Sequence, residues 1–327
     1  MACTYCIQGL NKPLDAFIEV DPDIVKTYFG KDTECTIVFY GGEPLLKFDY
    51  LIKLTTALKD YNDKLNFAVI TNGLLLTIEK AKKLNELGII VTLSHDGYNF
   101  EKMRCMPDIL AENPEPYLTL NKRTISATVS RLNYDYYDIW NYFDEFVIKH
   151  DLDKKEKVKI NLIRNAGGYT DKALLIEDMP EFEVMLDKTF ANLEHNIRIG
   201  NFDSYEFQQY QPMIYSLNYM INNNGNISAY CGADGSVAHM DIFGNLYPCH
   251  NLDTPNGHVK DKGIRSGEFN PYIGTENCKS CEAYLYCGGG CVAVPPELKE
   301  YDCYVIKEQY NRIIAMLHSL GESICKQ

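Results

Sequence analysis

The sequence predicts an α/β fold in which parallel strands alternate with helices, followed by a small cysteine-rich domain. Two observations carry this prediction. From residue 35 to about 165, short β-rich runs alternate with amphipathic stretches, and after about residue 226 cysteine and glycine become frequent. Alternating strands and helices are typical of a parallel sheet joined by right-handed crossovers. In such folds the functional residues collect at the C-terminal ends of the strands.

The predicted elements follow from hydrophobic periodicity and turn signals. The strands are expected at Cys35–Tyr40, Asn66–Ile70, Ile89–Leu93, Thr124–Ser130 and Lys157–Ile163. The helices are expected at Phe48–Tyr61, Thr77–Leu87, Tyr136–His150, Met179–Leu193, Tyr205–Ile221 and Val305–Ile324. Near the C-terminal region, Phe243, Gly244 and Asn245 read as a hairpin turn.

Three regions follow from these changes in character. Residues 1–165 hold the strand–helix series, residues 166–225 form a helical connection, and residues 226–327 form the cysteine-rich domain with its C-terminal helix. The turn signal at residues 222–226 (NNNGN) marks the last boundary.

Composition and charge narrow the classes of partner. The chain has 327 residues, 46% hydrophobic and 24% charged, which is ordinary for a globular protein with a core. No apolar run is long enough for a bilayer and no secretory signal follows Met1, so we expect a cytoplasmic protein without a membrane partner. The net charge of −13 argues against nucleic acid, because phosphate binding needs a basic surface.

The twelve cysteines are unevenly distributed. In a reducing compartment they are better explained as metal ligands or catalytic groups than as disulfides. Cys35, Cys105 and Cys325 are scattered and fit the role of small buried hydrophobes. The candidate metal ligands are the nine others: Cys3, Cys6, Cys231, Cys249, Cys278, Cys281, Cys287, Cys291 and Cys303.

The most specific spacing is Cys278-x2-Cys281-x5-Cys287-x3-Cys291. Thiolates on closely spaced turns suit an iron–sulfur cluster, and the three glycines between the last two cysteines let the chain bend around it. A tetrahedral zinc site is the alternative that spacing alone leaves open. Cys3-x2-Cys6 is a weak signal by itself, but it stands ahead of the strand–helix series.

Together these motifs resemble the radical S-adenosylmethionine (radical SAM) peptide and protein maturases that end in a SPASM domain. The resemblance covers nearly the whole chain. It implies a partial (β/α)6 TIM-like barrel, with the first strand missing, and up to three [4Fe–4S] clusters plus S-adenosylmethionine as cofactors.

The resemblance also implies a cofactor site at the strand ends. Residues 40–44 (YGGEP) resemble the family's GGEP motif, Thr71–Gly73 follows the next strand as in relatives, and residues 94–97 (SHDG) resemble its S-x-D-G motif. The implied cofactor-binding residues are Gly41, Gly42, Glu43, Pro44, Ser94 and Arg131. Glu43 would hold the amino group of the cofactor and Arg131 its carboxylate. The alternative for Glu43 is a helix N-terminal residue stabilised by the helix dipole.

The clusters are partitioned by the same resemblance. Cys3 and Cys6 would be two of the three ligands of the main cluster. One auxiliary cluster would be fully ligated by Cys278, Cys281, Cys287 and Cys303. The other would be held by Cys231, Cys249 and Cys291 and would keep an open iron site.

The first cysteine of the family's C-x3-C-x2-C motif would precede Met1 by two positions. We therefore expect Met1 to be an internal residue and the true start to lie upstream. A degenerate, inactive relative is the competing explanation. If the reading frame upstream of Met1 encodes no cysteine two positions before Met1, the hypothesis of an upstream start is ruled out.

The predicted function is radical SAM modification of a peptide or protein, with thioether crosslink formation on a ribosomal peptide as the best interpretation. A sulfatase-type formylglycine maturase is an alternative, but His250 replaces the acidic residue that those relatives carry after the cysteine matching Cys249. His250 is either a base near the open cluster or a structural residue. A non-catalytic cluster- or zinc-binding protein that recognises peptides is the third alternative. The expected partners are a peptide or protein substrate and an electron donor such as flavodoxin or ferredoxin.

Overall fold

The computed structural model describes most of the chain. The described residues are 3–6, 21–165, 170–223, 237–252, 254–261, 278, 280–291, 293–295 and 298–325. No helix in these ranges is both long enough and apolar enough to cross a bilayer.

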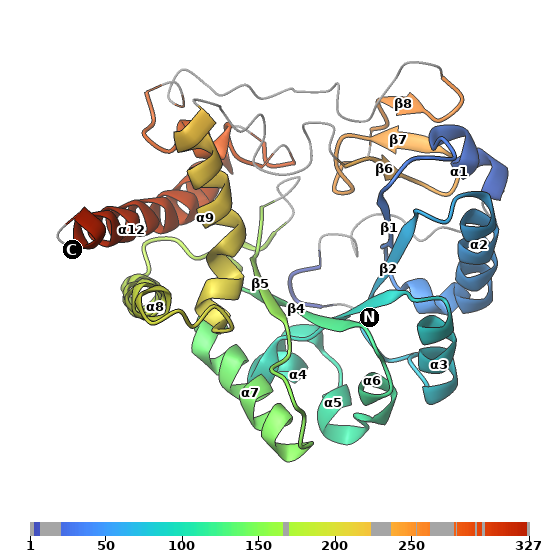
Figure 1. Ribbon diagram of the computed structural model, residues 1–327, viewed down its shortest axis with the longest axis horizontal. Helices are drawn as coiled ribbons and strands as arrows, with labels where there is room; N and C mark the ends of the chain where they lie inside the picture. Colours follow the sequence, from blue (N-terminus) through green and yellow to red (C-terminus); the bar gives the residue numbers. More distant parts are fainter. Residues whose placement is uncertain are drawn as a thin grey trace.

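The centre of the fold is a five-stranded parallel sheet whose strands lie in chain order. The strands are β1 (Thr36–Phe39), β2 (Asn66–Thr71), β3 (Ile90–Ser94), β4 (Arg123–Val129) and β5 (Val158–Leu162). Each lies within one residue of its predicted position, so the five predicted strands are confirmed. Figure 1 shows them as an open arc with helices along its outer side, which confirms the expected partial barrel.

The two faces of this arc differ in chemistry because side chains alternate along a strand. On β4, Ile125, Ala127 and Val129 are buried toward the helices, whereas the intervening hydroxyl residues face the other way and are half-buried. The same alternation on β2 and β3 buries Val69 and Leu93. The inner face of the arc is therefore more polar than the outer face.

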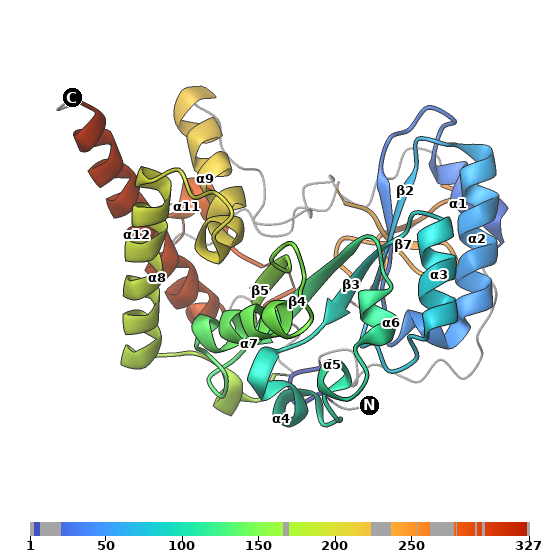
Figure 2. The ribbon, with the colours of Figure 1, turned by 60° about the horizontal axis from the view of Figure 1, so that its bottom comes forward.

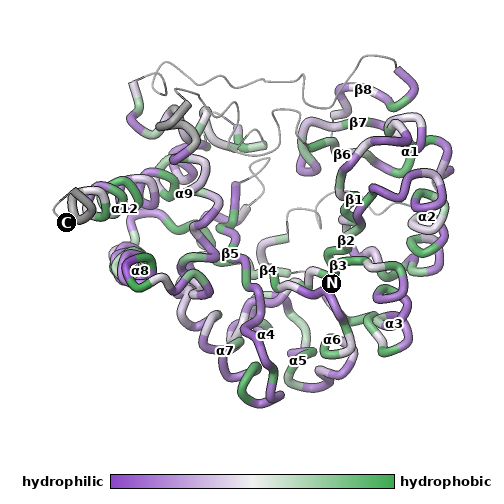
Figure 3. The backbone as a smooth tube through the Cα atoms, in the orientation of Figure 1, coloured by the Kyte–Doolittle hydropathy of each residue, from purple (hydrophilic) through white to green (hydrophobic). Residues whose placement is uncertain are grey.

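The longer helices on the outer side are α2 (Phe48–Tyr61), α3 (Ile78–Glu86) and α7 (Tyr136–Lys149). Each has the predicted position to within one residue. In α7 the Asp135 carboxylate caps the N-terminus by accepting from the Tyr137 amide. The buried side of α7 repeats at helical spacing, as Tyr136, Trp140 and Phe143 show. Figure 3 shows the mixed colouring of these helices beside the hydrophobic β2 and β3.

Several short helices are not predicted by the sequence patterns. They are α1 (Pro22–Tyr28), η2 (Pro44–Lys47), η3 (Gly97–Asn99), α4 (Phe100–Arg104), α5 (Ile109–Glu112), α6 (Glu115–Leu118), η5 (Lys172–Leu174) and α11 (Tyr284–Cys287). Most are shorter than two turns, so they carry too few residues for a periodic pattern to emerge.

Long helices gather beyond β5. They are α8 (Pro180–Arg198), α9 (Tyr205–Asn223) and α12 (Glu300–Cys325), and α12 packs on α8 (Figure 2). The Gln209 side chain on α9 accepts from the Ile160 amide and donates to the Ile160 carbonyl, both at 2.9 Å. These two bonds occupy the outer edge of β5 in the way a neighbouring strand would.

The predicted hairpin is also present. β6 (His239–Met240) and β7 (Asn245–Tyr247) are antiparallel, and β8 (Gly257–His258) extends them to a small three-stranded sheet. Gly244 has a φ of +85°, and a Cβ there would lie 2.9 Å from Ile24 of α1. The small sheet therefore packs closely against the helix that precedes β1.

Candidate cofactor and cluster site

The predicted cofactor residues lie at the C-terminal ends of adjacent strands. Gly41 and Gly42 follow β1, and Glu43 and Pro44 begin the short helix η2. Ser94 is the last residue of β3. Because β1, β2 and β3 are parallel neighbours, their ends meet at one edge of the sheet.

Glu43 is held by three hydrogen bonds. Its Oε1 accepts from the Leu45 amide at 3.0 Å and from the Thr71 hydroxyl at 2.7 Å, and its Oε2 accepts from the Asn72 amide at 2.8 Å. The carboxylate therefore caps η2 and joins the ends of β1 and β2. Two carboxylate oxygens offer about four lone-pair positions, so one remains for a further donor such as an ammonium group.

The inner face beside Ser94 is lined by hydroxyl and amide groups. Ser94 lies opposite Ser126 in the register, and Asn161 donates to the Ser126 hydroxyl oxygen at 2.9 Å. One layer deeper, the hydroxyls of Thr92 and Thr124 are 2.9 Å apart. The face that leads to the cofactor residues thus offers several donors and acceptors to a polar ligand.

Arg131 lies just beyond β4, and its guanidinium is directed to main-chain oxygen atoms. Its Nε donates to the Leu175 carbonyl at 3.1 Å and its Nη2 donates to the Glu177 carbonyl. A cofactor carboxylate would have to use the remaining N–H groups of this side chain.

The loop of residues 3–6 lies against the segment after β3. The Cys6 amide donates to the Cys3 carbonyl at 3.1 Å, which closes a tight turn. The Thr4 amide and the Thr4 hydroxyl both donate to the Met103 carbonyl, at 2.9 Å and 3.2 Å. Burial raises the pKa of the Cys3 thiol, and the nearby Arg104 guanidinium opposes this change.

Tyr40 directly follows β1, and the thiols of Cys6 and Cys249 both act on its hydroxyl group. Burial raises the pKa of its hydroxyl, and the neighbouring thiols of Cys6 and Cys249 raise it further. The Tyr40 ring contacts the His250 ring edge-on, with 4.7 Å between centroids. His250 in turn lies 5.1 Å from the His239 ring. Burial, followed by the effect of His239, lowers the pKa of His250 to about 4, so the imidazole is neutral at pH 7.

Four cysteines surround a common pocket in the C-terminal region. Its lining includes the side chains of Cys278, Cys281, Cys287 and Cys303. Burial raises the pKa of Cys287 to about 11, and the three other thiols of this group contribute to the increase. Gly288, Gly289 and Gly290 all have positive φ values, which fold the chain tightly after Cys287.

The other predicted cluster ligands are only partly described. Cys249 and Cys291 belong to one small apolar cluster that also contains Ala293. Cys231 lies outside the described residues. The Cys249 sulfur accepts from the Asn251 amide at 3.4 Å.

The donor set around the four-cysteine pocket fits an iron–sulfur cluster, because four thiols and flexible glycine backbone surround one space. Within the described ranges, however, no three cysteine, histidine or carboxylate side chains are arranged to hold a metal ion. The described cysteines form no disulfide bonds.

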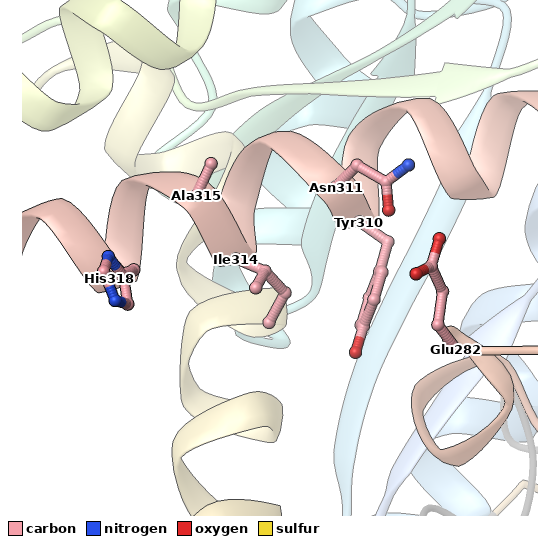
Figure 4. Close-up of a pocket in the computed structure, with 6 residues that line it drawn as sticks. All are labelled: Glu282, Tyr310, Asn311, Ile314, Ala315 and His318. Carbon is pink, nitrogen blue, oxygen red and sulfur yellow. The ribbon is translucent and has the colours of Figure 1, made fainter.

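A second pocket lies beside the four-cysteine pocket on the same long helix. Figure 4 shows Tyr310, Asn311, Ile314, Ala315 and His318 of α12 together with Glu282. Burial raises the pKa of Tyr310, with smaller contributions from Glu282 and Cys281. The two pockets are therefore close neighbours along α12.

Comparison with known proteins decides the class of this site. Residues 1–126 match the sequence model of the Radical SAM superfamily. The chain carries a radical SAM domain. Such a domain implies a [4Fe–4S] cluster and S-adenosylmethionine as cofactors, and the match spans Cys3, Cys6, Glu43 and Ser94.

Two curated relatives extend beyond the radical SAM domain. The radical SAM cyclopropyl synthase TigE of Paramaledivibacter caminithermalis is 23% identical over 302 residues, which cover 86% of this chain and 59% of TigE. The chain thus spans about three fifths of TigE. The cysteine-type anaerobic sulfatase-maturating enzyme of Clostridium perfringens is 24% identical, and the match covers 89% of this chain and 85% of the enzyme.

Solved structures share the fold. The structure of native anSMEcpe with bound AdoMet and Cp18Cys peptide has a TM-score of 0.69 at 20% identity, covering 98% of this chain and 95% of that one. A hexahistidine-tagged anSMEcpe structure with bound AdoMet has a TM-score of 0.72 at 19% identity, covering 98% of this chain and 91% of that one. The likeness shows that this chain shares the fold of those structures.

Two contacts of the site are not evident from the sequence. In the sequence Tyr40 is only part of a motif, whereas in the structure its ring contacts the ring of His250, which follows Cys249. Tyr5, Asp96 and Arg104 form a buried network that no local pattern connects. The available signal is weak: Tyr5 stands between two cysteines, and Asp96 stands in the S-x-D-G motif.

Proposed function

We propose that this chain is a radical SAM enzyme that modifies a peptide or protein. The observation that carries the proposal is the position of Tyr40. Its ring contacts the ring of His250, the residue after Cys249, so a substrate at the end of β1 would lie close to the cysteine-rich region.

The residues of the sheet edge would bind and orient the cofactor. Glu43 has one free lone-pair position for the amino group, and Ser94 lies at the end of β3 on the inner face. Cys3 and Cys6 would supply thiolates to the cluster. When bound, the cluster and S-adenosylmethionine supply hydrogen-atom abstraction, and the protein supplies position and exclusion of water.

The inner face supports a polar, extended substrate. Thr92, Thr124, Ser126 and Asn161 offer hydrogen-bonding groups there, and Lys159 is the single charged residue on this face of strands β1–β5. Peptide backbone carries regularly spaced donors and acceptors that match such a surface. The related anSMEcpe structure holds a bound peptide, which supports the same substrate class.

Within this class we propose thioether formation as the reaction. It requires a substrate thiol near the auxiliary cluster predicted at Cys249 and Cys291, which would keep an open iron site. The imidazole of His250, which follows Cys249, lies next to this place and is neutral at pH 7. Formylglycine formation is the second candidate, because the sulfatase-maturating relative matches over most of both chains.

The class is tested by measuring 5′-deoxyadenosine by mass spectrometry after anaerobic reconstitution with iron and sulfide. We expect Cys6→Ala to yield less 5′-deoxyadenosine than the wild type, because it removes a predicted ligand. Cys105→Ala is the matched control. The sequence predicts a buried place for Cys105, which is wrong: its side chain is exposed, and it lies outside both cysteine groups. Equal product from wild type and Cys6→Ala would contradict the proposal.

The reaction is tested with a synthetic cysteine-containing peptide incubated with the reconstituted enzyme. Thioether formation removes two hydrogen atoms and retains sulfur, whereas formylglycine formation from cysteine loses the sulfur. Peptide mass therefore separates the two candidates. A product without sulfur would overturn thioether formation while leaving the radical SAM class intact.

A further inference from the structure

The loop that carries Cys3 and Cys6 is tied to a buried ion pair. Asp96 is fully buried and Arg104 is 6% exposed. The Arg104 Nε lies 2.9 Å from Asp96 Oδ2, and its Nη2 donates to Asp96 Oδ1 at 3.0 Å. This two-point geometry fixes the carboxylate plane more strictly than a single contact would.

Tyr5 connects the cysteine loop to this pair. Its hydroxyl donates to Asp96 Oδ2 at 2.6 Å, across 91 positions of sequence. The Arg104 guanidinium also lies 5.6 Å from the centre of the Tyr5 ring. Since Tyr5 directly precedes Cys6, the position of the ring restricts the position of that thiol.

A third contact joins the pair to the central sheet. Asp96 Oδ1 accepts from the Thr128 amide at 2.8 Å, near the end of β4. Asp96 therefore binds three elements at once: the cysteine loop, helix α4 through Arg104, and β4. Each of its oxygens lies within 3.0 Å of two donor atoms, so both sides of the carboxylate are occupied by protein groups.

We propose that Asp96 and Tyr5 are positioning residues that hold the Cys3–Cys6 loop in its cluster-binding conformation before iron binds. The reason is that the network joins the loop to α4 and β4 through protein groups alone. The biological use of this anchor rests on the proposed function, since it assumes that the loop binds the main cluster.

The test uses the metal-free protein and the variant Tyr5→Phe, which removes the hydroxyl and leaves the ion pair in place. Alkylation by iodoacetamide is followed residue by residue with mass spectrometry. We expect Cys3 and Cys6 to be alkylated about tenfold faster in the variant, because a hydrogen bond to a buried charge is lost. Alkylation of the exposed Cys105 should not change.

Tyr142→Phe is the matched control. It removes a hydroxyl that donates to Asp108 at 2.7 Å in a neighbouring network that does not touch the loop. We expect its Cys3 and Cys6 rates to equal those of the wild type. Equal rates in Tyr5→Phe and wild type, or an equal increase in Tyr142→Phe, would overturn the proposal.

A second readout is the iron content after reconstitution. Tyr5→Phe should bind iron more slowly at the site of Cys3 and Cys6, and Asp96→Asn should have a larger effect. If Asp96→Asn fails to fold, Tyr5→Phe still decides the question. An inactive wild type with protected Cys3 and Cys6 would contradict the proposed function and leave the anchor standing.

Discussion

The Glu43 carboxylate joins the ends of two strands and is also the predicted ligand of the cofactor amino group. The substitution Glu43→Gln tests whether its hydrogen bonds stabilise the fold in the absence of cofactor. Glutamine keeps one oxygen, which is able to accept from Leu45 and Thr71. Its NH2 group would then face the Asn72 amide, donor against donor, where the carboxylate now accepts at 2.8 Å. Turning the side-chain amide over would place the same conflict at the other two donors.

The size of the effect follows from these contacts. At least one hydrogen bond to a charged group is lost, which costs about 1.5–3 kcal/mol. We therefore expect the free energy of unfolding of the metal-free protein to fall by about 2 kcal/mol. Urea unfolding followed by circular dichroism measures this change without any cofactor.

Glu79→Gln is the control for this experiment. Glu79 is an exposed carboxylate in the first turn of α3, so its change should stay within about 0.5 kcal/mol. If Glu43→Gln unfolds at the same urea concentration as Glu79→Gln, the three hydrogen bonds do not stabilise the strand ends. Glu43 would then matter only to the bound cofactor.

Three further predictions concern stability. Gly97→Ala should lower the free energy of unfolding by about 3 kcal/mol, because φ is +64° and the added Cβ would lie 2.9 Å from the Ile139 Cα atom of α7. Burial lowers the pKa of His95, so the folded protein resists protonation of this side chain. The contribution of His95 to the free energy of unfolding is therefore fully present above about pH 6.5. Below that pH the free energy of unfolding decreases by up to about 1.4 kcal/mol per pH unit. His95→Gln should reduce that slope when urea unfolding is measured from pH 7 to pH 5. Gln209→Ala should cost about 2 kcal/mol in the same assay, because it leaves the amide and carbonyl of the buried Ile160 without these partners.

Each of these has its own comparison. Gly200→Ala has the same backbone strain, with a φ of +72°, but no atom within 4 Å of the added Cβ. An equal loss in both glycine variants would show that contact with α7 is unimportant. If His95→Gln does not change the slope of the free energy of unfolding against pH, other groups cause the pH dependence. Gln208→Ala removes only an exposed bond to the Asp203 carbonyl, so a loss equal to that of Gln209→Ala would refute the edge argument.

The strands and long helices are predictable from the sequence because their patterns are local. The buried side of α2 and the alternation in β4 are each encoded within a few consecutive residues. The same patterns do not predict contacts between distant segments. Tyr5 meets Asp96 across 91 positions, and Tyr40 meets His250 across the two halves of the chain. Such contacts depend on how elements pack, which periodicity does not contain.

Arg131 illustrates the same limit at a single residue. Its place after β4 is readable from the sequence, and a role toward the cofactor carboxylate is an expectation from resemblance. The segment that receives its guanidinium, at Leu175 and Glu177, follows 44 to 46 positions later. No local pattern pairs the two, whereas the structure identifies competing acceptors for the N–H groups of Arg131.

The contact between Gln209 and Ile160 has a consequence for the breadth of the proposed substrate surface. A sheet grows by adding strands to its edge, and here a side chain from α9 occupies that edge. A further strand next to β5 would have to displace this helix at Ile160. The side-chain amide of Gln209 therefore limits the width of the inner face beyond β5. It limits in the same way the breadth of any peptide that lies on this face.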